Sequence, residues 1–125
     1  MSERCYLVYA LAPTGTSARD ANSRFNDYIA DTRRGICVFH DHFVREHGGV
    51  AVFDVRNDDE LAAVHDPGPL AGWDVRVHGL TFALTSVGFA AQTDFTLEQY
   101  RGTTLAALRA AELPEKRYWW REGSD

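Results

Sequence analysis

The feature that most restricts the fold of this chain is an alternation of short apolar runs with helical segments that begin at capping residues. The first run, Cys5–Ala12, is rich in β-forming residues and is followed by a Pro-Thr-Gly turn, which predicts an interior strand. Ser17 then precedes a segment with apolar residues at helical spacing. We expect this helix to end at Gly35, with Arg33 and Arg34 in its last turn, where cations suit the helix dipole.

The next segments repeat these signals as two strands and a helix. Ile36–Arg45 and Val50–Val55 are strand-like runs, and the Glu-His-Gly-Gly sequence between them predicts a hairpin turn because glycine permits positive φ. Asn57 is the expected cap of a short helix with acidic residues in its first turn. We expect this helix to end before Asp66, because a proline follows.

A fourth strand and a last helix complete the predicted elements. The residues from Trp73 to about Thr85 predict the strand, with an extended continuation as far as Phe89. Thr96, three residues before Gln99, is the expected cap of the last helix. The predicted order is therefore strand, helix, strand, strand, helix, strand and an extra helix.

This order predicts an α+β fold, a ferredoxin-like βαββαβ sandwich with an extra C-terminal helix. A right-handed strand–helix–strand crossover places the first and third strands side by side. A chain of 125 residues is long enough for a single domain that buries about two-thirds of its surface. We expect residues 1–90 to form the ferredoxin-like core and residues 91–125 to form the C-terminal helix and an aromatic tail.

The apolar character of the strands predicts a homodimer. Two helices can cover one face of the sheet, but the strands are apolar on both sides and the other face also needs a cover. Few residues of the chain remain for that task. A second subunit is the simplest cover, and two-fold dimers are the commonest oligomers, so we expect a dimeric α+β barrel.

Charge and composition argue against several classes of partner. The chain has 18 Asp and Glu residues against 13 Lys and Arg, and the net charge of −5 disfavours binding to nucleic acid. The basic and aromatic segment 116–121 is instead expected to dock on its own domain or on a partner subunit. The longest uncharged run, Val77–Thr93, is too polar to span a bilayer, so no membrane partner is predicted. Cys5 and Cys37 cannot form a disulfide framework. Met1–Arg4 does not have the pattern of a signal peptide, so we expect a cytoplasmic protein.

The stretch Val50–Phe82 contains a strand, an acidic capped helix, the Asp66–Pro67 dipeptide, a turn of small residues and a strand that ends in apolar residues. In this pattern it resembles the second half of the YCII-related proteins, within the dimeric α+β barrel superfamily. The resemblance covers roughly the first 85 residues of the chain. It implies the same fold and dimer but no particular reaction, because the superfamily includes cofactor-free oxygenases, isomerases, haem-degrading enzymes and proteins with no known activity.

One feature of the YCII-related proteins is missing from this chain. Those proteins often carry a histidine on the first helix, which is thought to act together with the aspartate of the Asp-Pro pair. The corresponding positions here hold Asn22, Asn26 and Tyr28. The family's catalytic pair therefore cannot be transferred to this sequence.

The most unusual local feature is the sequence His40-Asp41-His42. Residues two apart on a strand share a face, so the two imidazoles are expected side by side. Such a pair can hold a metal ion, with His78 of the same or a partner chain as a third ligand. The alternative is two histidines that line a polar cavity or a subunit interface. Cys37 is expected on the face opposite His40, which argues against a Cys–His pair.

Acid–base chemistry without a metal is a second interpretation of the same residues. One imidazole of His40 and His42 could remove a proton while the other, or Arg76, stabilises the resulting anion. Tyr6 or Tyr9 of the first strand could supply a phenol, and the choice depends on the register of the sheet.

Asp41 is a further catalytic candidate. It is expected to face away from the histidines, beside Phe39 and Phe43, where burial would raise the pKa of its carboxyl. The alternative is a structural ion pair with Arg45 or Arg76.

These patterns together favour a small-molecule-binding protein. Phe82, Tyr9 and Arg76 are the predicted substrate contacts, although core packing is the more ordinary role of an aromatic residue. Strand histidines could make the protein a small enzyme of the isomerase, lyase or oxygenase type. The alternative is a non-catalytic ligand-binding or structural dimer. The sequence identifies neither a substrate nor a cofactor.

Overall fold

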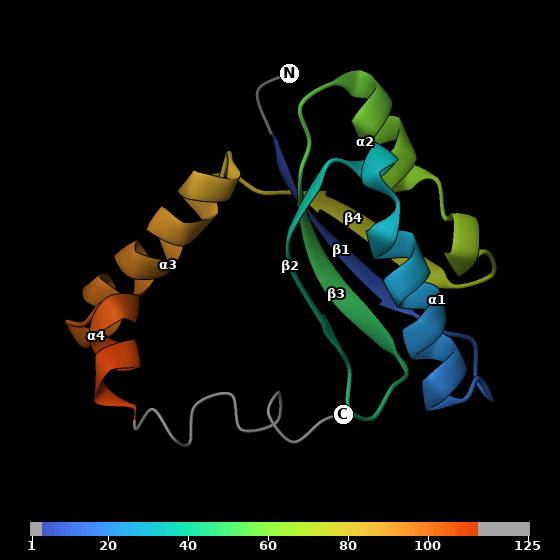
Figure 1. Cartoon of the computed structure of the whole chain (residues 1–125), viewed down its shortest axis with the longest axis horizontal. Helices are drawn as coiled ribbons and strands as arrows, with labels where there is room; N and C mark the ends of the chain where they lie inside the picture. Colours follow the sequence, from blue (N-terminus) through green and yellow to red (C-terminus); the bar gives the residue numbers. More distant parts are fainter. Residues whose placement is uncertain (1–3, 113–125) are drawn as a thin grey trace. The chain divides into compact units, whose positions relative to one another are not determined.

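A computed structural model describes residues 4–112 of the chain (Figure 1). Its elements are β1 (Cys5–Leu11), α1 (Ala18–Ala30), β2 (Ile36–His42), β3 (Gly48–Asp54), α2 (Asp58–His65), β4 (Asp74–Gly79), α3 (Ser86–Arg101) and α4 (Leu105–Ala111). The basic and aromatic segment 116–121 lies outside the described residues.

The four strands form one antiparallel sheet in the order β2-β3-β1-β4. The first and third strands are neighbours, as the predicted crossover requires. The fold is therefore α+β, and its strand order is compatible with a ferredoxin-like sandwich. Among residues 4–112, no helix combines the length and apolar character needed to cross a membrane.

The chain divides into two compact units, the first ending at Phe89 and the second beginning at Ala90. In the first unit, α1 and α2 lie against the same face of the sheet (Figure 1), which we call the covered face. Its residues include Val8, Ala51 and Phe53, which neighbour one another through the register. The other side, here called the open face, carries residues of the alternate positions, among them Leu7, Tyr9, Val50 and Val52.

The core lies between the covered face and the two helices. Phe25 and Tyr28 of α1 are fully buried, and the Tyr28 ring meets Phe53 of β3 edge-on with centroids 5.8 Å apart. Gly49 allows the Phe25 ring to pack against β3, because a Cβ atom at position 49 would lie 2.6 Å from that ring. The apolar periodicity of the first helix is thus confirmed as its buried face.

The predicted caps of α1 and α2 are confirmed. The Ser17 hydroxyl accepts a hydrogen bond from the Asp20 backbone N–H at 3.1 Å, and the Asn57 side chain accepts one from the Glu60 N–H at 2.9 Å. The carboxylate of Glu60 accepts from the backbone N–H of Arg56, one residue before the cap. These contacts are local in sequence, which is why the sequence pattern predicts them.

Arg34 lies outside the helix whose last turn it was predicted to occupy. The helix ends at Ala30, a 3-10 turn follows over Thr32–Arg34, and the Arg34 side chain is 2% exposed. Its guanidinium donates to the carbonyl oxygens of Tyr28 and Asp66, each at 3.0 Å, and lies over the Tyr28 ring. Arg34 therefore joins α1 to the turn after α2.

The prediction for the fourth strand and the following segment is wrong in its boundaries. In the described part of the chain, β4 pairs only with β1, and its last bond runs from the Leu80 N–H to the carbonyl of Cys5, where β1 begins. The continuation expected as far as Phe89 is not a strand, because Ser86 already begins α3. Thr96 lies inside this helix and donates its hydroxyl to the carbonyl of Gln92, so it is not a cap.

Asp54, at the end of β3, holds the start of α3. Its Oδ2 accepts hydrogen bonds from both the backbone N–H and the hydroxyl of Ser86, each at 2.9 Å. Arg4 donates to the other carboxylate oxygen at 3.0 Å. We call this contact the Asp54–Ser86 latch.

α3 begins in the first unit and continues into the second, where α4 follows it after a break at Gly102. Gly102 has φ of 63°, a conformation that favours glycine and ends helices. The Thr104 hydroxyl then accepts from the Ala107 N–H, and the Asp94 carboxylate accepts from the Leu105 N–H at 2.8 Å. Where one last helix was predicted, residues 86–111 therefore form two.

Candidate functional site

The register of the sheet separates the predicted site residues between its two faces. His40 lies opposite Ala51, and His42 lies opposite Gly49, so both histidines are on the covered face. The open face carries the other predicted strand residues of the site, namely Asp41, Tyr9, Arg76 and His78. The chain's own His78 therefore lies on the opposite side of the sheet from the histidine pair.

The two histidines are adjacent, and α1 positions one of them. Their rings meet edge-on with centroids 5.8 Å apart, and His40 is exposed while His42 is partly buried. His42 Nε2 lies 3.1 Å from the amide oxygen of Asn26, and the ring stands edge-on to Phe25. The helix thus fixes the orientation of one imidazole and leaves the other in solvent.

The environment of His42 favours its neutral form. Burial lowers the pKa of His42, the neighbouring His40 lowers it further, and Asp41 opposes these effects in part. With the Asn26 amide oxygen facing the ring, Nε2 carries the proton, because an amide oxygen only accepts. Nδ1 then bears a lone pair, and it is buried without a hydrogen-bond partner in the described part of the chain.

The histidine pair supplies two metal ligands of the three or four that a zinc site uses. Within residues 4–112, no three His, Cys, Asp or Glu side chains come close enough to hold one ion. A metal at His40 and His42 would need its remaining ligands from outside these residues.

A β-bulge changes the expected position of Cys37. Cys37 lies opposite Phe53, whereas Phe39 lies opposite Val52, so β2 contains one extra residue between them. Cys37 therefore shares the covered face with His40, contrary to the strict alternation assumed from the sequence. Burial raises the pKa of the Cys37 thiol, which opposes a role as a nucleophile.

On the open face, one row of the sheet contains three of the predicted site residues. The cross-strand neighbours in this row are Asp41, Val50, Tyr9 and Arg76, in order from β2 to β4. Asp41 is exposed, and its carboxylate accepts from the His42 N–H at 2.8 Å. The buried environment considered for Asp41 is therefore absent, and neither Arg45 nor Arg76 forms an ion pair with it in the described structure.

A shallow hollow of about 240 Å³ lies beside Tyr9 of this row and extends along β1 toward Leu11, on the side of the β2–β3 loop. Its floor is aromatic, with the rings of Tyr9 and Phe43 in tilted contact at a centroid separation of 5.2 Å. Leu11 adds an apolar wall, and Arg45 and Glu46 supply charged groups at the rim. We call this feature the Tyr9–Phe43 hollow.

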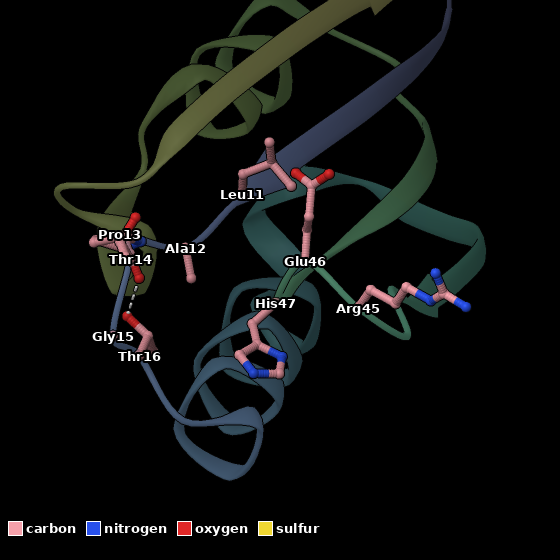
Figure 2. Close-up of a pocket in the computed structure, with 9 residues that line it drawn as sticks. All are labelled: Leu11, Ala12, Pro13, Thr14, Gly15, Thr16, Arg45, Glu46 and His47. Atoms are coloured by element: carbon pink, nitrogen blue, oxygen red, sulfur yellow. Dashed lines mark hydrogen bonds between the residues drawn. The ribbon is translucent and has the colours of Figure 1, made fainter.

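A second cavity of about 350 Å³ shares its Leu11, Arg45 and Glu46 lining with the hollow. It lies between the β1–α1 loop and the β2–β3 loop (Figure 2). Figure 2 shows the Arg45 side chain directed away from the β1–α1 loop, while the His47 imidazole lies on the same side as Ala12 and Thr16. His40 and His42 line neither cavity.

The remaining predicted contacts lie away from these features. His78 is exposed on β4, in the same row as Leu7 and next to the row that contains Arg76. Phe82 is 74% exposed in the segment between β4 and α3 and lines neither cavity.

Sequence reasoning missed the residues that shape the hollow. Phe43 was expected on a strand, but β2 ends at His42, and Phe43 begins a loop that turns its ring onto Tyr9. His47, in the Glu-His-Gly-Gly sequence of the predicted turn, is partly buried against the larger cavity. No local signal marks either role, since both depend on how the loop folds over β1.

Comparisons with known proteins found no matching family model, no matching curated protein and no matching solved structure.

Proposed function

We propose that this protein binds a small apolar or aromatic molecule in the Tyr9–Phe43 hollow. The observation that carries the proposal is an aromatic floor left accessible on the surface, with Tyr9 37% exposed. Aromatic rings in a concave site bind planar ligands by apolar contact and offset stacking, and a few polar groups at the rim set the orientation. The adjoining cavity extends the space available to a ligand beyond a single ring.

We further propose that the protein acts as a cytoplasmic homodimer of ferredoxin-like subunits. Two open faces packed together would produce the dimeric α+β barrel that the resemblance to YCII-related proteins implies. The exposed aromatic and aliphatic side chains of the open face, such as Phe39 at 47% exposure, support this part of the proposal. The free thiols of Cys5 and Cys37 suit a reducing compartment.

Ligand binding can be tested by titrating the protein with phenylacetate and, separately, with benzyl alcohol while amide chemical shifts are recorded by NMR. We expect shifts at Leu11, Tyr9 and Phe43, with millimolar or tighter affinity. Phe43→Ala should weaken binding at least about tenfold, because it removes half of the aromatic floor. The matched control is Val44→Ala, since Val44 is the next residue and is 92% exposed. Shifts confined to other parts of the sheet, or no shifts at all, would contradict the proposal.

A second candidate function is acid–base catalysis at the histidine pair. The observation in its favour is the His42–Asn26 hydrogen bond, which orients a neutral imidazole beside His40, and the exposed ring of His40 is the one that a substrate could reach. A metal on the same pair is the related alternative, and elemental analysis of the purified protein tests it. A stoichiometric metal that is lost in His40→Ala would favour the metal, whereas its absence would leave acid–base chemistry.

A further inference from the structure

The two charged residues at the rim of the Tyr9–Phe43 hollow are consecutive in the β2–β3 loop and have opposite signs. Arg45 and Glu46 line both the hollow and the adjoining cavity, so they lie where the two spaces meet. Both residues are exposed. A ligand that rests on the aromatic floor and extends toward the cavity therefore passes one charge of each sign.

Arg45 and Glu46 do not neutralise each other. Within residues 4–112, neither forms an ion pair with the other or with a third residue. Figure 2 shows that their side chains leave the loop in different directions, with the Arg45 guanidinium directed away from the β1–α1 loop and the Glu46 carboxylate on the side of Leu11. Both charges are therefore available to a ligand in the hollow.

The other charged residues near Tyr9 do not take the place of this pair. Asp41 and Arg76 lie in the same row of the sheet as Tyr9, but neither lines the hollow or the cavity. Arg76 also contacts Asp74 at 3.4 Å. The charges closest to the aromatic floor are therefore those of the loop.

Opposite charges beside an aromatic floor discriminate among ligands that contain a ring. A ring with one charged group is attracted to one of the two loop residues and repelled by the other, and these two effects largely cancel. A ring with both an ammonium and a carboxylate group can place each group near its opposite charge. Ion pairs between exposed groups are weak, so we expect each contact to raise the affinity by about threefold.

We propose that the ligand of the hollow is an aromatic zwitterion of the amino-acid class. Its ring packs on Tyr9 and Phe43, its carboxylate pairs with Arg45, and its ammonium group pairs with Glu46. The adjoining cavity supports this orientation, because His47 and the hydroxyl groups of the β1–α1 loop give a polar lining to the space beyond the two charges. The proposal rests on the ligand-binding function proposed above and specifies the chemical class of the ligand.

Four probes that share a benzyl group test the role of each charge: L-phenylalanine, phenethylamine, phenylacetate and benzyl alcohol. Amide NMR titrations of the full chain at low ionic strength should give L-phenylalanine the highest affinity, about five- to tenfold above benzyl alcohol. Phenethylamine and phenylacetate should stay close to benzyl alcohol. Raising the salt concentration from about 10 mM to about 500 mM should reduce the advantage of L-phenylalanine, because salt screens contacts between exposed charges.

Two variants that each remove one charge assign the two contacts. Arg45→Gln should lower the ratio of phenylalanine to phenethylamine affinity by about threefold, because only phenylalanine carries a carboxylate. Glu46→Gln should lower the ratio of phenylalanine to phenylacetate affinity by a similar factor. The matched controls are Arg19→Gln and Asp27→Asn on α1, which change the net charge equally, line neither cavity and should leave both ratios unchanged.

The results also separate this inference from the function on which it rests. Similar affinities for all four probes, in the wild type and in both variants, would show that the loop charges do not select the ligand, while the hollow would stand as an aromatic site. Tighter binding of phenylacetate or phenethylamine than of phenylalanine would overturn the zwitterion in favour of a ligand with one charge. No amide shifts at Tyr9 and Phe43 with any probe would contradict both the zwitterion and the hollow as a binding site.

Discussion

At the scale of single residues, neighbouring arginines have opposite roles. Arg34 is buried and bonds the carbonyl groups of Tyr28 and Asp66 as well as pairing with Asp31, while Arg33 is 78% exposed and, within residues 4–112, pairs with Asp31 alone. The sequence alone could not show which of the two arginines is buried, because Arg34 bonds the carbonyl oxygen of Asp66, which is 32 positions away. The same contact gives the Asp66–Pro67 dipeptide a structural role, since its first carbonyl accepts from Arg34.

Replacing Arg34 with Ala should lower the free energy of unfolding by about 2–4 kcal/mol, because two buried carbonyl oxygens lose charged donors and the Tyr28 ring loses its stacked cation. Urea denaturation followed by far-UV circular dichroism measures the change. Arg33→Ala is the control and should leave the midpoint nearly unchanged. Equal effects of the two substitutions would contradict the structural role of Arg34.

His42 predicts a pH dependence of stability with a definite sign. Its pKa is lowered in the folded chain, so near pH 7 both states are neutral, and below about pH 6.5 the unfolded chain binds a proton that the folded chain resists. Stability should therefore fall as the pH decreases from 7.5 through the lowered pKa of His42. Thermal melts of His42→Gln should show a smaller fall over this range than the wild type, with His47→Gln as the control. Identical slopes in all three proteins would show that His42 titrates normally.

At the scale of elements, features set by contacts between residues close in sequence were predicted, and features set by contacts between distant segments were not. The caps at Ser17 and Asn57 were predicted because each bonds an N–H only three residues away. The face assignment of Cys37 failed because a bulge depends on the pairing of two strands. The start of α3 was missed although Thr85 is a conventional cap, since the following Val-Gly-Phe sequence has weak helical character.

The corrected start of α3 can be tested by comparing two threonines. The Thr85 hydroxyl accepts from the Gly88 N–H at 3.0 Å, so Thr85→Ala should destabilise the helix by about 1 kcal/mol. Thr96 is exposed within the helix, and Thr96→Ala should be neutral or stabilise by a few tenths of a kcal/mol. Hydrogen exchange of the α3 amides measures both effects. A larger loss at Thr96 would restore the helix start originally predicted.

At the scale of the whole molecule, the topology of the sheet was the most predictable feature. Once the four strands and the first two helices are placed in order, the right-handed crossover rule allows few strand orders. The observed order, with β1 between β3 and β4, is one of them. The candidate site was less predictable. The row from Asp41 to Arg76 depends on the register of three strand pairs, and the hollow depends on a loop that brings Phe43 onto Tyr9.

The Asp54–Ser86 latch joins the sheet to the first turn of α3, close to the boundary between the two compact units. Burial would raise the pKa of the Asp54 carboxyl, but the hydrogen bonds from Ser86 and Arg4 outweigh this effect and hold the pKa below its usual value. The carboxylate therefore stabilises the latch at neutral pH, and this contribution is lost only as the pH falls below about 4 and passes through the lowered pKa.

Asp54→Ala should release the start of α3 while the sheet remains folded. The variant loses three hydrogen bonds, two of them from Ser86, so we expect the segment 80–90 to become sensitive to limited proteolysis and the first turn of α3 to lose exchange protection by about 1–3 kcal/mol. Amides of β1 and β3 should keep their protection.

Asp74→Ala is the matched control, because its carboxylate is exposed and lies on β4 away from the latch. A uniform loss of protection across the sheet would mean that Asp54 supports the whole first unit, and unchanged cleavage would mean that Ser86 does not depend on it.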